Sequence, residues 1–509
     1  MPFLPYEQHQ ILLLPPNVGD LIPENDLCRV INEFVDGLPR LSVEDGVQKE
    51  TGAPLYHPRM MLKVLLYGYT QKVYSCRHIA KKLRQDICFM WLSGMQNPSF
   101  NTVNRFRTQY LSEILPEIFG KLSEFLLESR YIRREDYFVD GTIMEANAGK
   151  YTHVWKKNVA RYKKAVEERA LQILKEADRI NQEEDALYGE SDLPERGEGS
   201  SLSSSEIRQR ARALIESGEK EDQKAAKQLE KEAEKLAHYE EQEEILEDRN
   251  SYSKTDTDAT FMRTKEDMLR PAYNVQAGTQ DGFVTGMTIS QNGNDARGFI
   301  EHMETRKEIG LAPPPTVTAD AVYGTEENYE YIEKESIEGY LKYPSWYREM
   351  KGKLKPYEKS SFTYDAEQDR FCCPRGHFLE FIKEQQEKTK SGYTRTERIY
   401  ECRDCGSCDV KSQCTRSQGN RQITHSAILY QHQQKARMRL SSPKGESLRK
   451  RRSPEIETVF GHIKHNMSIR RFLLRGLKKV TTEMFWIVLG YNMTHLWSRI
   501  GGEQHPAVV

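Results

Sequence analysis

The most constraining feature of this sequence is an ordered series of short β-type and helical segments between residues 137 and 344. The first β-type run precedes a long charged insertion, and two further runs flank the turn-forming segment Gly278–Gly282, which predicts a hairpin. Two more β-type runs then alternate with helical segments, which favours a mixed α/β sheet covered by helices. The predicted strands are residues 137–142, 273–277, 283–289, 316–320 and 339–344, and the predicted helices between them are residues 299–309 and 326–335.

Acidic residues lie at the ends of two predicted strands and beside a third apolar segment. Asp140 lies near the end of the first predicted strand and Asp320 ends the fourth, so we expect them at the same end of neighbouring strands. Between residues 448 and 467, apolar residues recur at helical spacing, with Glu457 beside the stripe and Lys464 two turns further on. Any one of these acids alone would more often be a helix cap or a surface charge. Three converging carboxylates predict two Mg²⁺ or Mn²⁺ ions, which would support phosphoryl transfer.

The charge of the chain is divided along its length. The 75 Lys and Arg against 76 Asp and Glu give a net charge of −1, which by itself argues against a nucleic-acid partner. Residues 411–479, however, contain 17 basic and 3 acidic residues, a balance of +14, whereas residues 161–250 have a balance of −9. The basic segment suits a polyanion such as DNA. The residues expected to contact it are Arg449, Lys450, Arg451, Arg452, Arg470, Arg471, Arg475 and Lys478.

The segments at residues 1–130 and 161–250 are predicted to be helical and to lie outside the sheet. Residues 1–130 have helical periodicity and a basic, amide-bearing stretch, which is consistent with a helix-turn-helix DNA-binding unit or with an ordinary helical domain. Residues 161–250 predict a solvated helical hairpin with a loop at residues 189–205. The first fourteen residues lack a secretory signal pattern, and the apolar stretch Phe485–Trp497 is too short to span a bilayer. A cytoplasmic protein with no membrane partner is therefore expected.

Residues 351–424 form a cysteine-rich insertion with a different chemistry. Six of the nine cysteines of the chain lie between residues 372 and 414. A small β-rich module with little core gains stability from a tetrahedral zinc ion, and a disulfide framework is disfavoured in a reducing cytosol. Reduced cysteines without metal remain the alternative. The candidate zinc ligands are Cys373, His377, Cys402, Cys405, Cys408 and Cys414.

Taken together, these residues resemble a bacterial insertion-sequence transposase of the Asp-Asp-Glu (DDE) class, which has an RNase H-like catalytic core. The resemblance covers nearly the whole chain and rests on the motifs around the three acids. It is strengthened by Ser253–Asp256, Tyr273–Gln276 and Arg470–Gly476. Related transposases carry a Tyr-Arg-Glu-Lys signature, of which this chain keeps Glu457 and Lys464. It departs from that signature because Lys450 and Ser453 stand where the Tyr and the Arg are expected.

The resemblance implies that Asp140, Asp320 and Glu457 bind the catalytic metals and that Lys464 holds a phosphate near the cut. It also implies that residues 1–130 help to recognise double-stranded transposon ends, and that a homodimer acts in the DNA complex, at the nucleoid. The core would then comprise residues 131–160, 251–350 and 425–500, with insertions at 161–250 and 351–424. The alternatives are an inactive DNA-binding descendant, a stand-alone nuclease of the same fold, and a zinc-bearing scaffold that binds protein.

Overall fold

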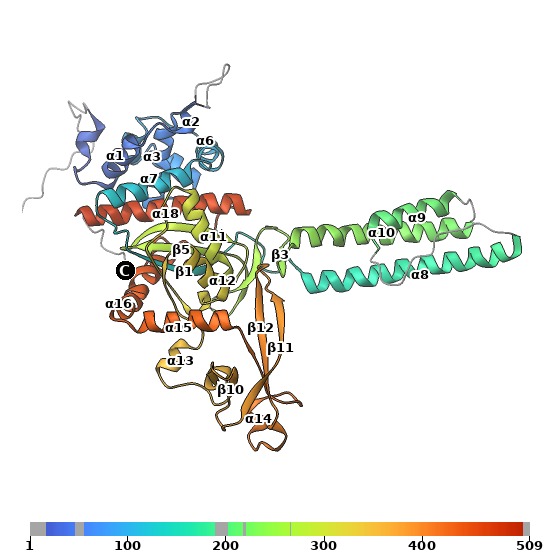
Figure 1. Cartoon of the computed structure of the whole chain (residues 1–509). Helices are drawn as coiled ribbons and strands as arrows, with labels where there is room; N and C mark the ends of the chain where they lie inside the picture. Colours follow the sequence, from blue (N-terminus) through green and yellow to red (C-terminus); the bar gives the residue numbers. More distant parts are fainter. Residues whose placement is uncertain (1–16, 46–54, 189–201, 217–219, 265, 502–509) are drawn as a thin grey trace, which may run out of the picture.

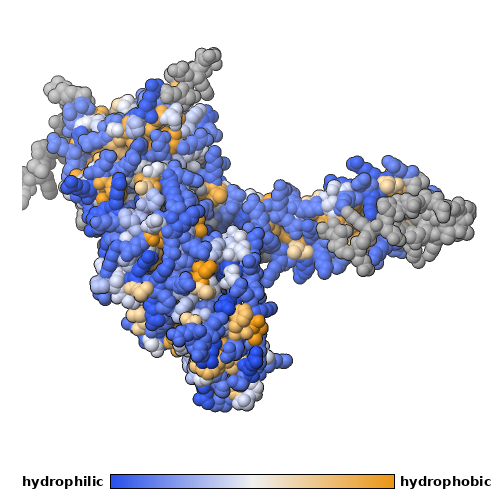
Figure 2. Space-filling model, in the orientation of Figure 1, coloured by the Kyte–Doolittle hydropathy of each residue, from blue (hydrophilic) through white to orange (hydrophobic). Residues whose placement is uncertain are grey.

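The computed structural model describes residues 17–45, 55–188, 202–216, 220–264 and 266–501. The amino-terminal segment considered for a secretory signal, and most of the predicted loop at 189–205, lie outside these residues. No helix in the described part of the chain is long and apolar enough to cross a membrane. The face drawn in Figure 2 is mostly hydrophilic, with small, separated apolar patches.

A mixed sheet forms the centre of the molecule. Its strands run in the order β4-β5-β1-β7-β8, and β6 also pairs with β5. The strand β1 is antiparallel to β5 and parallel to β7, which is in turn parallel to β8. Helices α11 (Asp295–Glu308) and α12 (Glu326–Lys334) follow β6 and β7 as expected. The predicted α/β fold is confirmed, and it is RNase H-like. The strands are β1 (Asp136–Glu145), β4 (Thr260–Arg263), β5 (Leu269–Gln280), β6 (Phe283–Ser290), β7 (Thr316–Ala319) and β8 (Glu338–Leu341).

The amino-terminal helices pack on the last helix of the chain rather than around a core of their own. Helix α18 (Leu477–Ile500) lies between these helices and the sheet (Figure 1). Its Trp486 stacks on Tyr69 with ring centroids 5.9 Å apart, and both belong to one hydrophobic cluster that extends to β5 and β6. The first and last parts of the chain therefore stabilise each other. The amino-terminal elements are η1 (Val18–Leu21), α1 (Leu27–Gly37), α2 (Ser42–Asp45), α3 (Pro58–Thr70), α4 (Cys76–Lys82), α5 (Ile87–Leu92), α6 (Phe100–Arg105), η2 (Phe106–Tyr110) and α7 (Leu115–Glu128).

The acidic insertion forms a helical arm that projects from the core (Figure 1). It contains α8 (Lys156–Tyr188), α9 (Ser204–Glu216) and α10 (Lys220–Leu246), so a third helix accompanies the two of the expected hairpin. These helices bury a hydrophobic cluster that is separate from the main core. A short antiparallel pair, β2 (His153–Trp155) with β3 (Ser251–Ser253), closes the base of the arm.

The cysteine-rich insertion folds as a second sheet, antiparallel throughout, in the order β13-β12-β11-β10-β9. The turn between β11 and β12 reaches back to the core, where the Tyr393 hydroxyl donates to Glu326 (3.0 Å) and Glu330 (2.9 Å) of α12. Both ends of the long hairpin are thus fixed. The elements are α13 (Trp346–Met350), η4 (Lys359–Ser361), β9 (Thr363–Asp365), β10 (Arg370–Cys372), β11 (Phe378–Lys388), β12 (Thr394–Cys402), η5 (Cys405–Ser407), α14 (Lys411–Cys414) and β13 (Gln422–His425).

The chain returns to the core through α15 (Ala427–Ser441), which leads into an irregular helical rod. Where one helix was expected over 448–467, α16 (Pro443–Arg452) and α17 (Thr458–Gly461) alternate with the π-turns η6 (Ser453–Glu457) and η7 (His462–Asn466). Pro454 lacks the amide hydrogen that a regular helix needs, which explains the widening of the first π-turn. The apolar stripe of this rod faces the core as expected, because Ile456, Val459 and Ile463 are buried.

Candidate active site

Asp140 and Asp320 lie side by side at one edge of the central sheet. The parallel register pairs Phe138 of β1 with Thr318 of β7, and the same register continued two residues further sets Asp140 beside Asp320. Asp320 directly follows β7 and precedes the short helix η3 (Ala321–Tyr323). Its carboxylate Oδ1 lies 3.7 Å from Nζ of Lys342. Asp320 follows its strand as expected, whereas Asp140 is an interior residue of β1, so the prediction that both acids end strands is wrong for Asp140.

Arg452 occupies the space between Asp140 and Glu457. One of its terminal nitrogens lies 3.0 Å from Oδ2 of Asp140, and the other lies 3.8 Å from Oε1 of Glu457. Glu457, at the end of η6, also accepts a hydrogen bond from Ser453 Oγ at 2.7 Å. Although Arg452 was expected on the DNA-contacting surface, its side chain is only 9% exposed, so its charge serves the carboxylates. Carboxylates from β1 and from η6 therefore flank one buried guanidinium, whereas Asp320, after β7, pairs with Lys342.

The environment of Asp140 disfavours its charged form. Burial raises the pKa of this carboxyl above its ordinary value, and the charges of Asp295 and Asp320 raise it further. The Arg452 guanidinium and the Gly141 amide act in the opposite direction. A second cation near this carboxylate would be electrostatically favoured for the same reason.

Lys464 is held against the strand that carries Asp140. Its ammonium donates to Oγ1 of Thr142 at 2.6 Å and to the carbonyl oxygen of Ile143 at 3.0 Å. The side chain thus fixes the helical rod to β1 two residues beyond Asp140. In this structure it supports the strand, whereas the sequence suggested a phosphate ligand.

The other basic residues are of two kinds: some contact groups within the protein, and others are exposed. Arg449 stacks over Trp346, and Arg451 pairs with Asp136, so both are partly satisfied within the protein. Lys450 is exposed beside Glu446. The exposed residues of the loop after the rod and of the start of α18 form what we call the basic loop: Arg470, Arg471, Arg475 and Lys478.

One acidic residue near the site was missed by the sequence interpretation. Asp295, the first residue of α11, packs against Gly141, the neighbour of Asp140. Its Oδ1 accepts hydrogen bonds from Asn274 (2.6 Å) and Gln276 (2.8 Å) of β5. The sequence pattern shows only an acid in a first helical turn, which is common. The contact depends on the pairing of β1 with β5, which no local pattern reveals.

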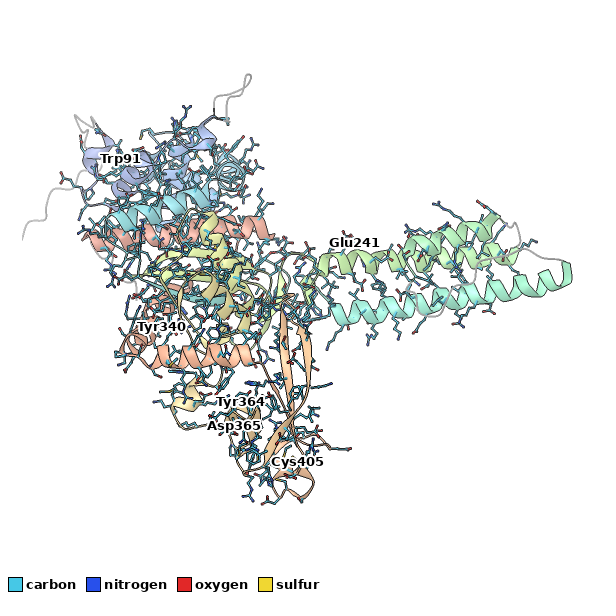
Figure 3. All side chains as sticks on the ribbon, in the orientation of Figure 1. Trp91, Glu241, Tyr340, Tyr364, Asp365 and Cys405 are labelled. Atoms are coloured by element: carbon cyan, nitrogen blue, oxygen red, sulfur yellow. The ribbon has the colours of Figure 1, made fainter. Side chains whose placement is uncertain are left out.

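Five of the candidate zinc-binding cysteines surround a cavity of about 20 Å³ at the end of the second sheet. They are joined by His377, whose Nδ1 lies 3.7 Å from Asp404. The Cys373 sulfur accepts the amides of Arg375 (3.4 Å) and His377 (3.3 Å), and the Cys405 sulfur accepts the amide of Arg421 (3.4 Å). Figure 3 labels Cys405 at the far end of this sheet. The lining cysteines are Cys373, Cys402, Cys405, Cys408 and Cys414.

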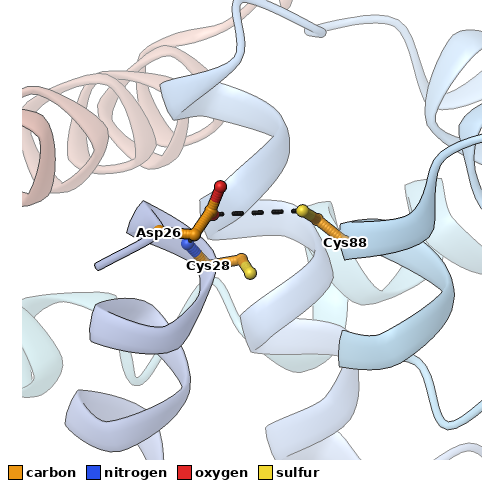
Figure 4. A group of neighbouring side chains, drawn as sticks. All are labelled: Asp26, Cys28 and Cys88. Carbon is orange, nitrogen blue, oxygen red and sulfur yellow. Dashed lines mark hydrogen bonds between the residues drawn. The ribbon is translucent and has the colours of Figure 1, made fainter. Parts of the chain in front are cut away.

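A tighter group of donor atoms lies among the amino-terminal helices (Figure 4). In the described part of the chain, only Asp26, Cys28 and Cys88 bring three donor atoms within 4.8 Å of one another. Asp26 caps α1 by accepting the Cys28 amide at 2.8 Å, and Cys88 of α5 approaches the same carboxylate at 3.9 Å. Through these hydrogen bonds, the group connects α1 to α5.

Two segments of the chain match known protein families. Residues 372–497, which include the second sheet, the helical rod and most of α18, match the family described as "Transposase DDE domain". Residues 16–109 match the family described as "Transposase domain (DUF772)". Comparison with curated proteins and with solved structures gives no match. The two family matches, on a chain with an RNase H-like core, support an insertion-sequence transposase of the DDE class.

Proposed function

We propose that this transposase cuts DNA at the ends of an insertion sequence and joins the freed 3′ ends to target DNA in a metal-dependent reaction. The observation that carries the proposal is that Asp140 shares the Arg452 guanidinium with Glu457 and is close enough to Asp320 to be affected by its charge. Water and then a 3′-hydroxyl would be the successive nucleophiles.

The donor set fits hard divalent cations. Carboxylate oxygens are the ligands that Mg²⁺ and Mn²⁺ prefer, and Asp140, Asp320 and Glu457 supply them from one sheet edge and one π-turn. When bound, two such ions would activate the attacking oxygen and stabilise the leaving one. Arg452 would keep Asp140 and Glu457 oriented through its two terminal nitrogens.

The surface chemistry supports double-stranded DNA as the substrate. The residues of the basic loop are exposed and follow the helical rod in sequence. The guanidinium groups of Arg471 and Arg475 also donate to backbone carbonyl oxygens of residues 146–148, which fixes the loop beside β1. We infer that this loop contacts backbone phosphates beside the cut, and that the amino-terminal helices contribute to recognition of the ends. A homodimer would hold two ends together on nucleoid DNA.

We also infer that a structural zinc ion binds among the thiols that line the cavity of the second sheet. Backbone amides directed at the sulfur atoms of Cys373 and Cys405 hold these two candidate ligands in place at the cavity. The ion would stabilise a sheet whose hydrophobic cluster is small.

The test uses linear DNA that carries the element's ends, with Mg²⁺, and separates cutting from joining. Asp140→Ala and Glu457→Gln are expected to lower both rates by at least about a hundredfold, because each removes charge that the transition state needs. Asp248→Ala and Glu244→Gln, which change exposed acids at the base of the arm, are the matched controls.

Undiminished cleavage by Asp140→Ala would rule out the proposed site. Cutting without joined product would indicate a stand-alone nuclease. Binding without any cutting by the wild-type protein would indicate an inactive descendant.

A further inference from the structure

A buried hydrogen-bond relay joins the strand that carries Asp140 to the turn that follows Asp320. It begins at Asp295, whose Oδ1 accepts the amide groups of Asn274 (2.6 Å) and Gln276 (2.8 Å). The side-chain oxygen Oε1 of Gln276 then accepts a hydrogen bond from the Tyr323 hydroxyl at 2.5 Å. Asn274, Gln276 and Tyr323 are each at most 1% exposed, so these bonds form away from water.

The first end of the relay rests on β1 beside Asp140. Gln276 lies directly opposite Gly141 in the β1–β5 pairing. A Cβ atom at Gly141 would lie 2.1 Å from Asp295 Oδ1 and 2.5 Å from the Gln276 amide nitrogen. Only glycine allows both groups to pack on the backbone here, so the Asp295–Gln276 contact sets the position of the strand next to Asp140.

The second end of the relay fixes the turn that begins at Asp320. The Tyr323 amide donates to the Asp320 carbonyl oxygen at 3.1 Å, so the tyrosine closes the turn that presents Asp320. Asn328 of α12 donates to the carbonyl oxygens of Tyr323 (3.0 Å) and of Ala296 (3.1 Å), next to Asp295. The turn is therefore connected to both helices and, through Gln276, to β5.

We propose that Asp295 is a positioning residue for the catalytic site, which acts through Gln276 and Tyr323 to fix Asp140 and Asp320 relative to each other. The inference rests on the proposed function, because a shared divalent ion tolerates little change in the spacing of two carboxylates. An ordinary first-turn acid would stabilise α11 alone, and it would need neither two buried amides on one oxygen nor a glycine at residue 141.

The test measures Mn²⁺ affinity by electron paramagnetic resonance, without DNA and therefore independently of activity. Asp295→Ala removes the acceptor and is expected to weaken Mn²⁺ binding by at least about tenfold, as for other residues that orient metal ligands. Asp295→Asn keeps an oxygen that can accept both amides, and it is expected to restore affinity close to wild type. Tyr323→Phe breaks only the last link and is expected to give an intermediate loss. Glu308→Ala, at the exposed other end of α11, is the control.

Unchanged Mn²⁺ affinity in folded Asp295→Ala would overturn the inference, and so would an Asn variant as weak as the Ala variant. If Asp295→Ala does not fold, Tyr323→Phe provides the test. Wild-type Mn²⁺ affinity in Tyr323→Phe would show that the relay does not position the metal ligands. Failure of the wild-type protein to bind Mn²⁺ would instead contradict the proposed function.

Discussion

Glu483 organises the basic loop from inside the protein. The side chain is 2% exposed, and its carboxylate accepts the backbone amides of Leu473 (2.9 and 3.0 Å) and Leu474 (2.8 Å). Burial raises the pKa of this carboxyl, and the two amides oppose the shift. The loop that carries Arg470, Arg471 and Arg475 is therefore tied to α18 through one residue.

Replacing Glu483 by Ala should destabilise the protein and weaken DNA binding together. Two backbone amides would lose a buried acceptor, which costs at most about 1–3 kcal/mol for each amide left unpaired. Urea unfolding would measure the free energy of unfolding, and DNA titrations at several salt concentrations would measure affinity. Glu113→Ala removes an exposed acid 3.6 Å from Lys478 and should change stability by less than about 0.5 kcal/mol. A stable Glu483→Ala protein with normal DNA affinity would show that the loop is held in another way.

Sequence patterns identified some residues of the site and missed others. Asp140 and Asp320 follow β-type runs, so their neighbourhood follows from the parallel register. Arg452 and Asp295 could not be placed in this way. A run of four basic residues does not show which one turns inward, and the Asp295 contact requires a strand pairing between residues more than a hundred positions apart.

Among the elements, local pattern predicted most of the core but not its irregularities. The order of β1, β5, β6, α11, β7, α12 and β8 follows from alternation and turn residues, whereas the short strands β2, β3 and β4 were not predicted. The π-turns around Glu457 were not expected, because an apolar stripe at helical spacing looks the same in a regular helix. The second sheet was expected only as a cysteine-rich β module, since its long hairpin is largely exposed and lacks a clear alternation of apolar residues.

The second sheet offers a prediction about metal content. The purified protein should contain about one zinc ion per chain, and a chelator should release it and lower the midpoint of thermal unfolding. Cys405→Ser and Cys414→Ser should reduce the zinc content. Cys372→Ser is the matched control, because Cys372 does not line the cavity and its thiol donates to the Cys373 carbonyl oxygen. Full zinc content in both test variants, or a protein that never holds zinc, would contradict the assignment.

In the whole molecule, the segments that differ in charge are not the same as the segments that have separate hydrophobic cores. The amino-terminal helices share a hydrophobic cluster with α18 and the sheet, so that part cannot be removed without exposing core residues. The arm carries most of the negative balance and buries its own cluster. Composition predicted the arm as a solvated insertion, whereas the packing of the first helices on the last required the tertiary structure. The net charge of the whole chain therefore bears on solubility, whereas the charge of each segment bears on function.

The arm should be removable as a unit. Lys163 and Glu243 face each other across its base with an Nζ–Oε2 distance of 2.6 Å, so a short Gly-Ser linker could replace residues 164–242. The buried cluster of Val154, Val159, Leu246 and Tyr252 lies below that point and would be kept, with the loss of Tyr239, which packs against it. We expect the midpoint of thermal unfolding of the core to change by less than about 4 °C, because the deleted segment has a separate core. DNA affinity at low salt should stay equal or rise, since an acidic segment is lost, and the difference should vanish as salt screens the charges. Loss of the folded core would show that the arm stabilises it, and a fall in affinity would show that the arm itself contacts DNA.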